Sequence, residues 1–457
     1  MRHYFLPVIA IFISAFGHSQ EQQQENTNSF TLQEAIAFAL DNNYSAINAE
    51  RDVVDAQKQK WETIASGLPQ ISGAVNYQNQ LIQPIAQFPS ILVPEEFLPP
   101  GAVRDPNTFV PIVFGQPQQI IATATLRQQI FDGSYIVGVQ ATKSFLSYSA
   151  NNKEKTQLEV RKAVTESYGN VLLAQESVSI LEKNKANLEK NLFETTKIYE
   201  NGLGDEESVE QLQITLSNVE NQLKNAVRLK SITLQMLNLV MGIAIDAPTK
   251  LEEDLDNLTR EQIDLNLIEA EFQIENNVDF KLATNLNEQR YFEWKLAKSR
   301  ALPTLNAFVN YGANSFGEGF DFLDNGQEWF ESSIFGVDLN IPIFSSLKRS
   351  ASTQRAKIAL EKAKTQLQEA EERIRLQLEN AKSEYILAIE QYETAKQNLG
   401  LAERIENKNQ TKYFEGIGSS FELRQAQTQL YDAQQGYLQS MVEVINKKTE
   451  LETIMNQ

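Results

Sequence analysis

The sequence has 457 residues, with 41 Lys and Arg against 60 Asp and Glu, so its formal net charge is -19. It contains no cysteine and two histidines, His3 and His18, which excludes disulfides and disfavours Cys or Ser-His nucleophiles and the usual zinc, copper or haem ligand sets. The negative charge argues against nucleic acid, and against an anionic membrane surface, as partners.

The N-terminus has the pattern of a secretory signal peptide. Arg2 precedes an apolar run over residues 4–16, and an abruptly polar stretch follows. We therefore expect a signal peptide over residues 1–19, cleaved near Ser19 or Gln20, and an N-terminal extension over residues 20–30. Both histidines lie in the part expected to be removed. Neither a cofactor nor a metal site is expected. A carboxylate-dependent hydrolase is disfavoured, because the sequence shows no compact domain with a clustered pair of acids.

The remaining chain is written twice, in the order helix, strand, strand, helix. The pair Asn42-Asn43 recurs as Asn276-Asn277, displaced by 234 residues (276 minus 42). Later landmarks recur with a displacement of 213 or 214 residues, which places 21 extra residues between the strands of the first copy. The landmarks displaced by 234 residues include Leu68-Pro69 and Tyr77, which recur as Leu302-Pro303 and Tyr311. Those displaced by 213 are Leu126, Ile130 and Phe131, which recur as Leu339, Ile343 and Phe344, and those displaced by 214 are Tyr199, Gly202 and Gly204, which recur as Tyr413, Gly416 and Gly418.

Two strands are expected in each copy. Residues 71–81 and 333–344 alternate apolar and polar side chains with period two, the pattern of a half-buried strand, and residues 120–131 and 305–311 supply two more. Four strands are too few to close in a membrane, where an open edge leaves backbone groups unsatisfied. Either the strands lie outside a membrane or several chains pool them.

The loops between the strands differ in length. The first, over residues 82–119, contains eight of the 13 prolines and four phenylalanines, so it is expected to be extended and external. The second, over residues 312–332, is shorter.

The helices are too long for a globule. From Arg349 to Phe414 the chain has no proline and one interior glycine, so it predicts a helix of roughly 100 Å. Its apolar positions recur every three or four residues with one stutter, and alternate seam positions are alanine. This heptad pattern is typical of tightly packed coiled-coil helices. The seam is Leu360, Ala363, Leu367, Ala370, Ile374, Leu378, Ala381, Tyr385, Ala388, Tyr392, Ala395, Leu399 and Ala402.

This organisation resembles the TolC-like outer-membrane factors, the exit ducts of bacterial efflux and type I secretion, over essentially the whole mature chain. The most specific local similarity is Tyr413-x-x-Gly416 followed by residues 426–434, with Tyr199-x-x-Gly202 as the counterpart in the first repeat. The resemblance implies an α+β membrane protein. Three chains would pool their strands into one twelve-stranded outer-membrane β-barrel, continuous with a long periplasmic α-helical coiled-coil tunnel.

The resemblance also implies roles and partners. It implies an outer-membrane channel of a Gram-negative bacterium, a homotrimer in contact with outer-membrane lipid, that performs no chemistry. A periplasmic adaptor (membrane fusion) protein would join it to an inner-membrane RND or ABC pump. The adaptor-docking tips would be at Tyr199, Gly202, Gly204, Tyr413, Gly416 and Gly418.

Acidic residues after the tip glycines are the candidates for a gate: Glu422 in the second repeat, and Asp205, Glu206 and Glu207 in the first. Gln425 and Ser208 stand where the resemblance would place further acids. Asp205 also fits a helix N-cap, and Ser419-x-x-Glu422 fits a capping box, so both gating and capping remain open.

A different class of protein also fits part of the pattern: a periplasmic coiled-coil adaptor or scaffold, whose strands would form a small soluble domain. Two full repeats speak against it, because adaptors usually carry a single helical hairpin. The expected organisation is repeat 1 over residues 31–242 with a helical turn at 201–205, an equatorial linker over 243–266, and repeat 2 over 267–457 with a turn at 415–419.

Overall fold

The computed structural model describes residues 28–113 and 115–456, so the expected signal peptide lies outside the described residues. The chain divides into two compact units. The tip unit comprises the described residues up to Asn43 together with 163–263 and 389–446, and the sheet unit comprises 44–162, 264–388 and 447–457. None of the helices in the described part is long and apolar enough to cross a membrane.

Two long helices contribute to both units, α3 (Gly133–Glu200) and α8 (Lys348–Phe414). The tip unit adds β1 (Asn28–Phe30), α1 (Leu32–Asn42), α4 (Glu206–Met241), β6 (Thr249–Leu251), α5 (Leu255–Glu261) and most of α9 (Ser420–Met455). The sheet unit adds α2 (Tyr44–Ala65), β2 (Gln70–Asn79), β3 (Ile85–Pro89), η1 (Ser90–Leu92), η2 (Glu95–Phe97), β4 (Phe109–Val113), β5 (Gln118–Asp132), α6 (Asn266–Glu269), η3 (Ile274–Asn276), α7 (Val278–Ser299), β7 (Thr304–Gly317) and β8 (Phe330–Asn340).

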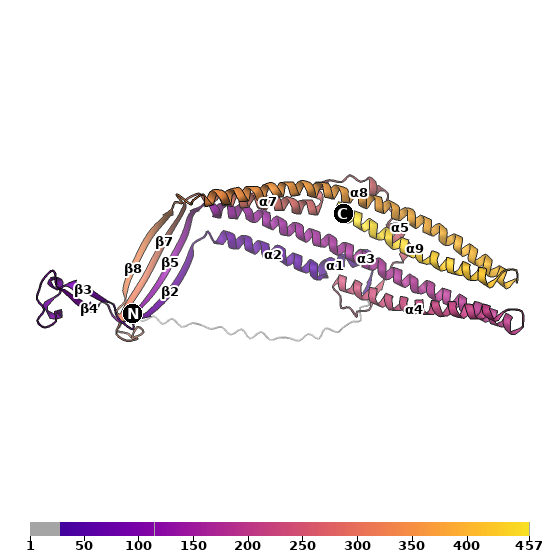
Figure 1. The fold of residues 1–457 in the computed structure, drawn as a ribbon, viewed down its shortest axis with the longest axis horizontal. Coiled ribbons are helices and arrows are strands. Elements are labelled where there is room, and N and C mark those ends of the chain that lie inside the picture. The colour runs from indigo at the N-terminus through magenta and orange to yellow at the C-terminus, as the bar shows by residue number, and fades with distance from the viewer. Residues whose placement is uncertain (1–27, 114, 457) are drawn as a thin grey trace, which may run out of the picture. The chain divides into compact units, whose positions relative to one another are not determined.

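The main sheet is antiparallel, in the order β2-β5-β7-β8 (Figure 1). The central pair, β5 with β7, joins the strands of the two repeats. The register therefore brings apolar residues of all four strands onto one face, because directly paired residues point to the same side. That face carries Ile71, Val75, Tyr77, Ile120, Ala122, Ala124, Leu126, Leu305, Ala307, Val309, Tyr311, Phe335, Val337 and Leu339.

The opposite face of the sheet is mostly polar, with Asn76 on β2, Thr125 on β5, Asn310 on β7 and Asp338 on β8. The apolar face is exposed nevertheless: Phe335 keeps 72% of its surface accessible within the chain. In the described part of the chain, nothing pairs with the outer edges of β2 and β8. Unpaired strand edges offer N–H and C=O groups to further strands.

The coiled-coil seam predicted for α8 is confirmed. Ten of its residues are buried, and Leu367, Ala395 and Leu399 are half-buried. Alternating small and large residues allow close helix packing, with Tyr385 and Tyr392 filling the larger gaps.

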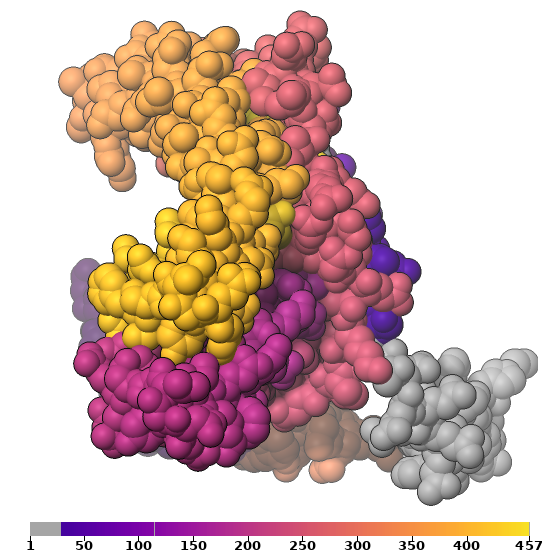
Figure 2. Space-filling model, turned by 90° about the vertical axis from the view of Figure 1, so that its right-hand side faces the viewer, coloured from indigo at the N-terminus to yellow at the C-terminus, as the bar shows by residue number. Residues whose placement is uncertain are grey.

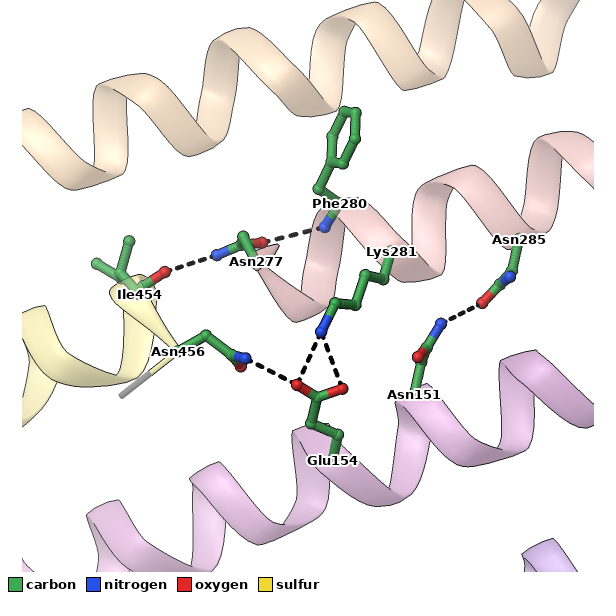
Figure 3. Close-up of polar contacts among 8 residues, drawn as sticks. All are labelled: Asn151, Glu154, Asn277, Phe280, Lys281, Asn285, Ile454 and Asn456. Carbon is green, nitrogen blue, oxygen red and sulfur yellow. Dashed lines mark hydrogen bonds and ion pairs between the residues drawn. The ribbon is translucent and has the colours of Figure 1, made fainter. Parts of the chain in front are cut away.

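A polar network joins three helices of the sheet unit (Figure 3). Lys281 Nζ on α7 lies 2.9 Å from Glu154 Oε1 on α3, and Asn456 Nδ2, just after α9, donates to the same carboxylate oxygen at 2.7 Å. Burial raises the pKa of Glu154, but these two partners outweigh it and hold the pKa below its ordinary value. Asn151 donates to Asn285 at 2.6 Å on the same face of α3.

The fold class expected from the sequence is confirmed, and several segments contain more structure than expected. The strand at 305–311 extends to Gly317, whereas β8 ends at Asn340, so residues 341–344 are not strand. The proline-rich loop contains the hairpin β3–β4. The expected polar linker contains β6 and α5, and β6 pairs in parallel with β1 of the N-terminal extension. These pairings are non-local, so local pattern did not reveal them.

Candidate docking and gating tips

The first helical turn, between α3 and α4, is closed by a Schellman arrangement. Gly202 has φ +73°, its N–H donates to Tyr199 O at 2.8 Å, and Leu203 N–H donates to Ile198 O at 3.0 Å. Such a cap needs a left-handed residue, which glycine adopts without steric cost. The chain then enters α4 with Asp205 as the N-cap.

The second turn, between α8 and α9, repeats this geometry. Gly416 has φ +77°, its N–H donates to Tyr413 O at 3.1 Å, and Ile417 N–H donates to Lys412 O at 3.0 Å. The sequence thus encodes one turn twice, and both helices reverse by the same physical device.

The other two tip glycines, Gly204 and Gly418, serve a different purpose from Gly202 and Gly416. Gly204 and Gly418 do not have positive φ. A Cβ on Gly418 would lie 2.9 Å from Lys412 Cβ, and one on Gly204 would lie 3.1 Å from Ile198 Cγ2. They are glycine because the returning chain passes close to the end of the preceding helix.

The two hairpins lie side by side in the tip unit, the first magenta and the second orange to yellow in Figure 2. Polar side chains connect them: Gln410 Nε2 donates to Asn191 Oδ1 at 3.0 Å, and the Thr195 and Tyr413 hydroxyls are 3.3 Å apart. Tyr413 therefore faces the neighbouring hairpin, whereas Tyr199 is exposed. Beneath these contacts an apolar cluster contains Leu188, Leu212, Val219, Leu181, Leu192, Leu216 and Tyr431.

Three of the four candidate gate acids, Asp205, Glu207 and Glu422, have identifiable structural roles. Ser208 N–H donates to Asp205 Oδ1 at 2.7 Å, and this bond holds the pKa of Asp205 below its ordinary value. Glu422 and Ser419 form a reciprocal capping box, with bonds of 3.1 and 3.2 Å. Glu207 accepts from Gln211 at 2.7 Å. Capping by Asp205 and Glu422 is therefore realised, and it leaves their charges at the ends of the tips.

Sequence reasoning missed the most exposed apolar residues of the tips. Leu203 keeps 81% and Ile417 keeps 73% of its surface accessible. Each lies between two glycines, at equivalent positions of the two repeats, and that recurrence was the available signal. Phe421, 60% exposed, adds to this apolar surface. Exposed apolar residues at recurring positions are typical of an interaction surface.

The tip unit also has a groove between α3, α4 and α9, away from the turns. It has a volume of about 780 Å³ and includes Leu181, Asn218, Gln222, Thr428 and Gln435 among its lining residues. In the described residues, no group of three or more His, Cys, Asp or Glu side chains could hold a metal ion.

Comparison with known proteins identifies the fold as that of bacterial outer-membrane channels. VceC of Vibrio cholerae superposes with a TM-score of 0.69 at 15% identity, covering 93% of this chain and 96% of VceC. CmeC of Campylobacter jejuni gives 0.71 at 16% identity, covering 98% and 94%. The open-state MtrE channel of Neisseria gonorrhoeae gives 0.70 at 14%, covering 93% and 88%.

The sequence of the second repeat matches a family model. Residues 274–457 match the family model of outer membrane efflux proteins, which confirms the resemblance seen in the sequence. No curated protein matches the sequence significantly.

Proposed function

We propose that this protein is the outer-membrane channel of a tripartite efflux or type I secretion system. It is a passive exit duct, coupled through a periplasmic adaptor to an inner-membrane RND or ABC pump. The observation that carries the proposal is the amphipathic sheet with two unpaired edges, at the end of helices too long for a globule. The alternative, a periplasmic adaptor or scaffold, is not favoured, because channel structures match at least 93% of the chain.

The proposed assembly is a homotrimer in the outer membrane. β8 of one copy would pair with β2 of the next, which satisfies both edges. The apolar face would then lie against lipid and the polar face would line the duct. No step of catalysis is assigned to the chain.

The first experiment measures the native mass of the detergent-extracted protein from separated membranes. We expect a species of three times the mature chain mass in the outer-membrane fraction. A soluble monomer or dimer would contradict the duct and favour the periplasmic scaffold.

We place adaptor docking at the two tips, on Leu203, Ile417 and the glycine turns that present them. The exposed apolar pair supports this position, since its burial by a partner would be favourable by about 25 cal/mol per Å². The duplicated turns give each chain two equivalent docking points. In this proposal, Tyr199, Gly204, Tyr413 and Gly418 shape the turns.

The docking prediction concerns the double variant Leu203→Asp, Ile417→Asp. We expect pump-dependent export to fall at least tenfold while the native mass stays unchanged, because both side chains are exposed and their replacement creates no buried charge. The matched control is Leu376→Asp, an equally exposed leucine on α8 away from the turns. Export at the wild-type level in the double variant would remove the tips as docking points.

We propose that Glu422, Asp205, Glu206 and Glu207 also attract cations at the inner mouth. Replacing Glu422 with Gln keeps an acceptor for the capping box and removes the charge. Reduced cation preference in a planar bilayer is the expected result, and an unchanged preference would leave capping as its only role.

A further inference from the structure

The last turns of α7 carry two pairs of a lysine with an aromatic ring. Lys295 Nζ is 4.8 Å from the centroid of the Tyr291 ring, and Lys298 Nζ is 4.7 Å from that of Trp294. The four residues are spaced i, i+3, i+4 and i+7, so they share one face of the helix. This aromatic-cation face ends one residue before the end of α7, shortly before β7 begins.

On the aromatic-cation face, Tyr291 and Lys298 are exposed and Trp294 and Lys295 are half-buried. The other face of α7, with Gln289, Phe292 and Leu296, lines a cavity of about 260 Å³ shared with α2 and α3. The helix α2 likewise has one face toward the cavity and one toward the outside: Thr63 lines that cavity, and Trp61 is 60% exposed. Trp61 is two residues away from Thr63, so it projects to the opposite side of its helix.

The helix segments next to the sheet are basic in an acidic chain. Residues 55–66, 133–147, 288–300 and 348–364, which we call the basic collar, contain 13 Lys and Arg and five Asp and Glu, whereas the whole chain has a net charge of -19. Within the collar, Arg290 is already paired with Glu293 at 2.7 Å. Lys298 and Lys348 are exposed, and so is Lys357, whose Nζ lies 3.8 Å from Glu361 Oε1. The basic collar is therefore positively charged although the whole chain is negatively charged.

The four segments of the basic collar adjoin the strands at the end of the apolar face of the sheet. If that face lies in lipid, as proposed above, the adjoining helix turns lie at the level of the lipid headgroups. Trp and Tyr favour this level because their rings are amphipathic, and Lys next to them meets the headgroup phosphates. Aromatic rings and cations thus occur together at the depth at which anionic headgroups are available.

We propose that the aromatic-cation face of α7, together with Trp61 and the basic residues of the collar, binds the headgroups of anionic phospholipids in the periplasmic leaflet. This inference rests on the proposed outer-membrane location. It reverses the expectation, from total charge, that an anionic membrane surface is excluded. The bound lipid would fix the height of the sheet in the membrane.

The experiment measures lipids retained by the full-length protein in native mass spectrometry, after reconstitution with phosphatidylglycerol or with phosphatidylcholine. The variant is Lys295→Gln, Lys298→Gln, and the control is Lys224→Gln, Lys408→Gln, two exposed lysines outside the collar. We expect the variant to retain at least threefold less phosphatidylglycerol than the wild type, with phosphatidylcholine unchanged and no loss in the control.

Equal retention in variant and wild type, or an equal loss in the control, would overturn the lipid site. A changed anion preference of the channel with unchanged lipid retention would instead place the lysines in the duct. If the double variant does not fold, as judged by circular dichroism, the single variant Lys298→Gln replaces it. Absence of the wild-type protein from the outer membrane would refute the proposed function, a result separate from the lipid count.

Discussion

At the residue scale, the repeated asparagines have the same structural role in both repeats. Asn43 Nδ2 donates to Val240 O at 2.6 Å, and Asn277 Nδ2 donates to Ile454 O at 2.8 Å. Each amide binds a carbonyl near the C-terminal end of a helix in its own repeat, where helical carbonyls lack intrahelical partners. The recurrence of the asparagines was visible in the sequence. Their partners were not, because they lie 197 and 177 residues away.

Glu406 gives a prediction at the same scale. Burial raises the pKa of this carboxyl on α8, although a hydrogen bond with Gln427, itself 2% exposed, lowers it in part. A raised folded-state pKa favours the neutral form, so the folded protein loses stability as pH rises from the unfolded pKa through the folded one. We expect Glu406→Gln to raise the thermal midpoint by a few degrees at pH 8, with the difference shrinking as the pH falls through the raised pKa.

The control for Glu406 is Glu403→Gln, an exposed acid one turn earlier on α8. It should leave the midpoint and its pH dependence unchanged. If the thermal midpoints of Glu406→Gln and the wild type differ by the same amount from pH 4 to 8, the titration of Glu406 does not cause the difference.

At the element scale, the effect of a glycine on stability depends on its place in a helix. Gly242 ends α4 with φ +78°, and a Cβ there would lie 2.1 Å from Asn42 O. Gly400 lies inside α8, and a Cβ there would meet no atom within 4 Å in this chain. Helix length and turn position followed from local patterns, but only the packed structure separates an obligatory glycine from a dispensable one.

We therefore expect opposite effects from two alanine substitutions. Gly242→Ala should destabilise by about 2 kcal/mol or more, since both backbone conformation and space oppose it. Gly400→Ala should stabilise by about 0.5–1 kcal/mol, the usual gain in a helix interior. The measurement is the thermal midpoint of the purified protein, and a stabilising Gly242→Ala would contradict the assigned cap.

At the scale of the whole molecule, the proposed outer-membrane location rests on the two faces of the sheet. Val337 lies on the apolar face of β8 and is 54% exposed, and Asp338 follows it on the polar face. A lysine on the lipid side of a transmembrane strand costs about 2–4 kcal/mol near the bilayer centre, whereas a lysine facing water does not.

We expect Val337→Lys to lower the amount of trimer in the outer membrane severalfold, and Asp338→Lys to leave it near the wild-type level. Quantitative immunoblots of separated membranes, with unboiled samples to preserve trimers, measure both. Equal amounts for the two variants would mean that the apolar face does not contact lipid.

The sequence by itself determined the duplication, the long helices with their alanine-rich seam, the four strands and the places where the helices turn. The helices and strands follow from local periodicities, carried by residues three, four or two apart, and the duplication from residues that recur 213 to 234 positions later. Tertiary structure decided what depends on distant residues: the β5–β7 pairing that makes one apolar face, the close approach that requires Gly418, and the exposure of Leu203 and Ile417. It also placed four separate basic segments next to the sheet, which total charge had concealed.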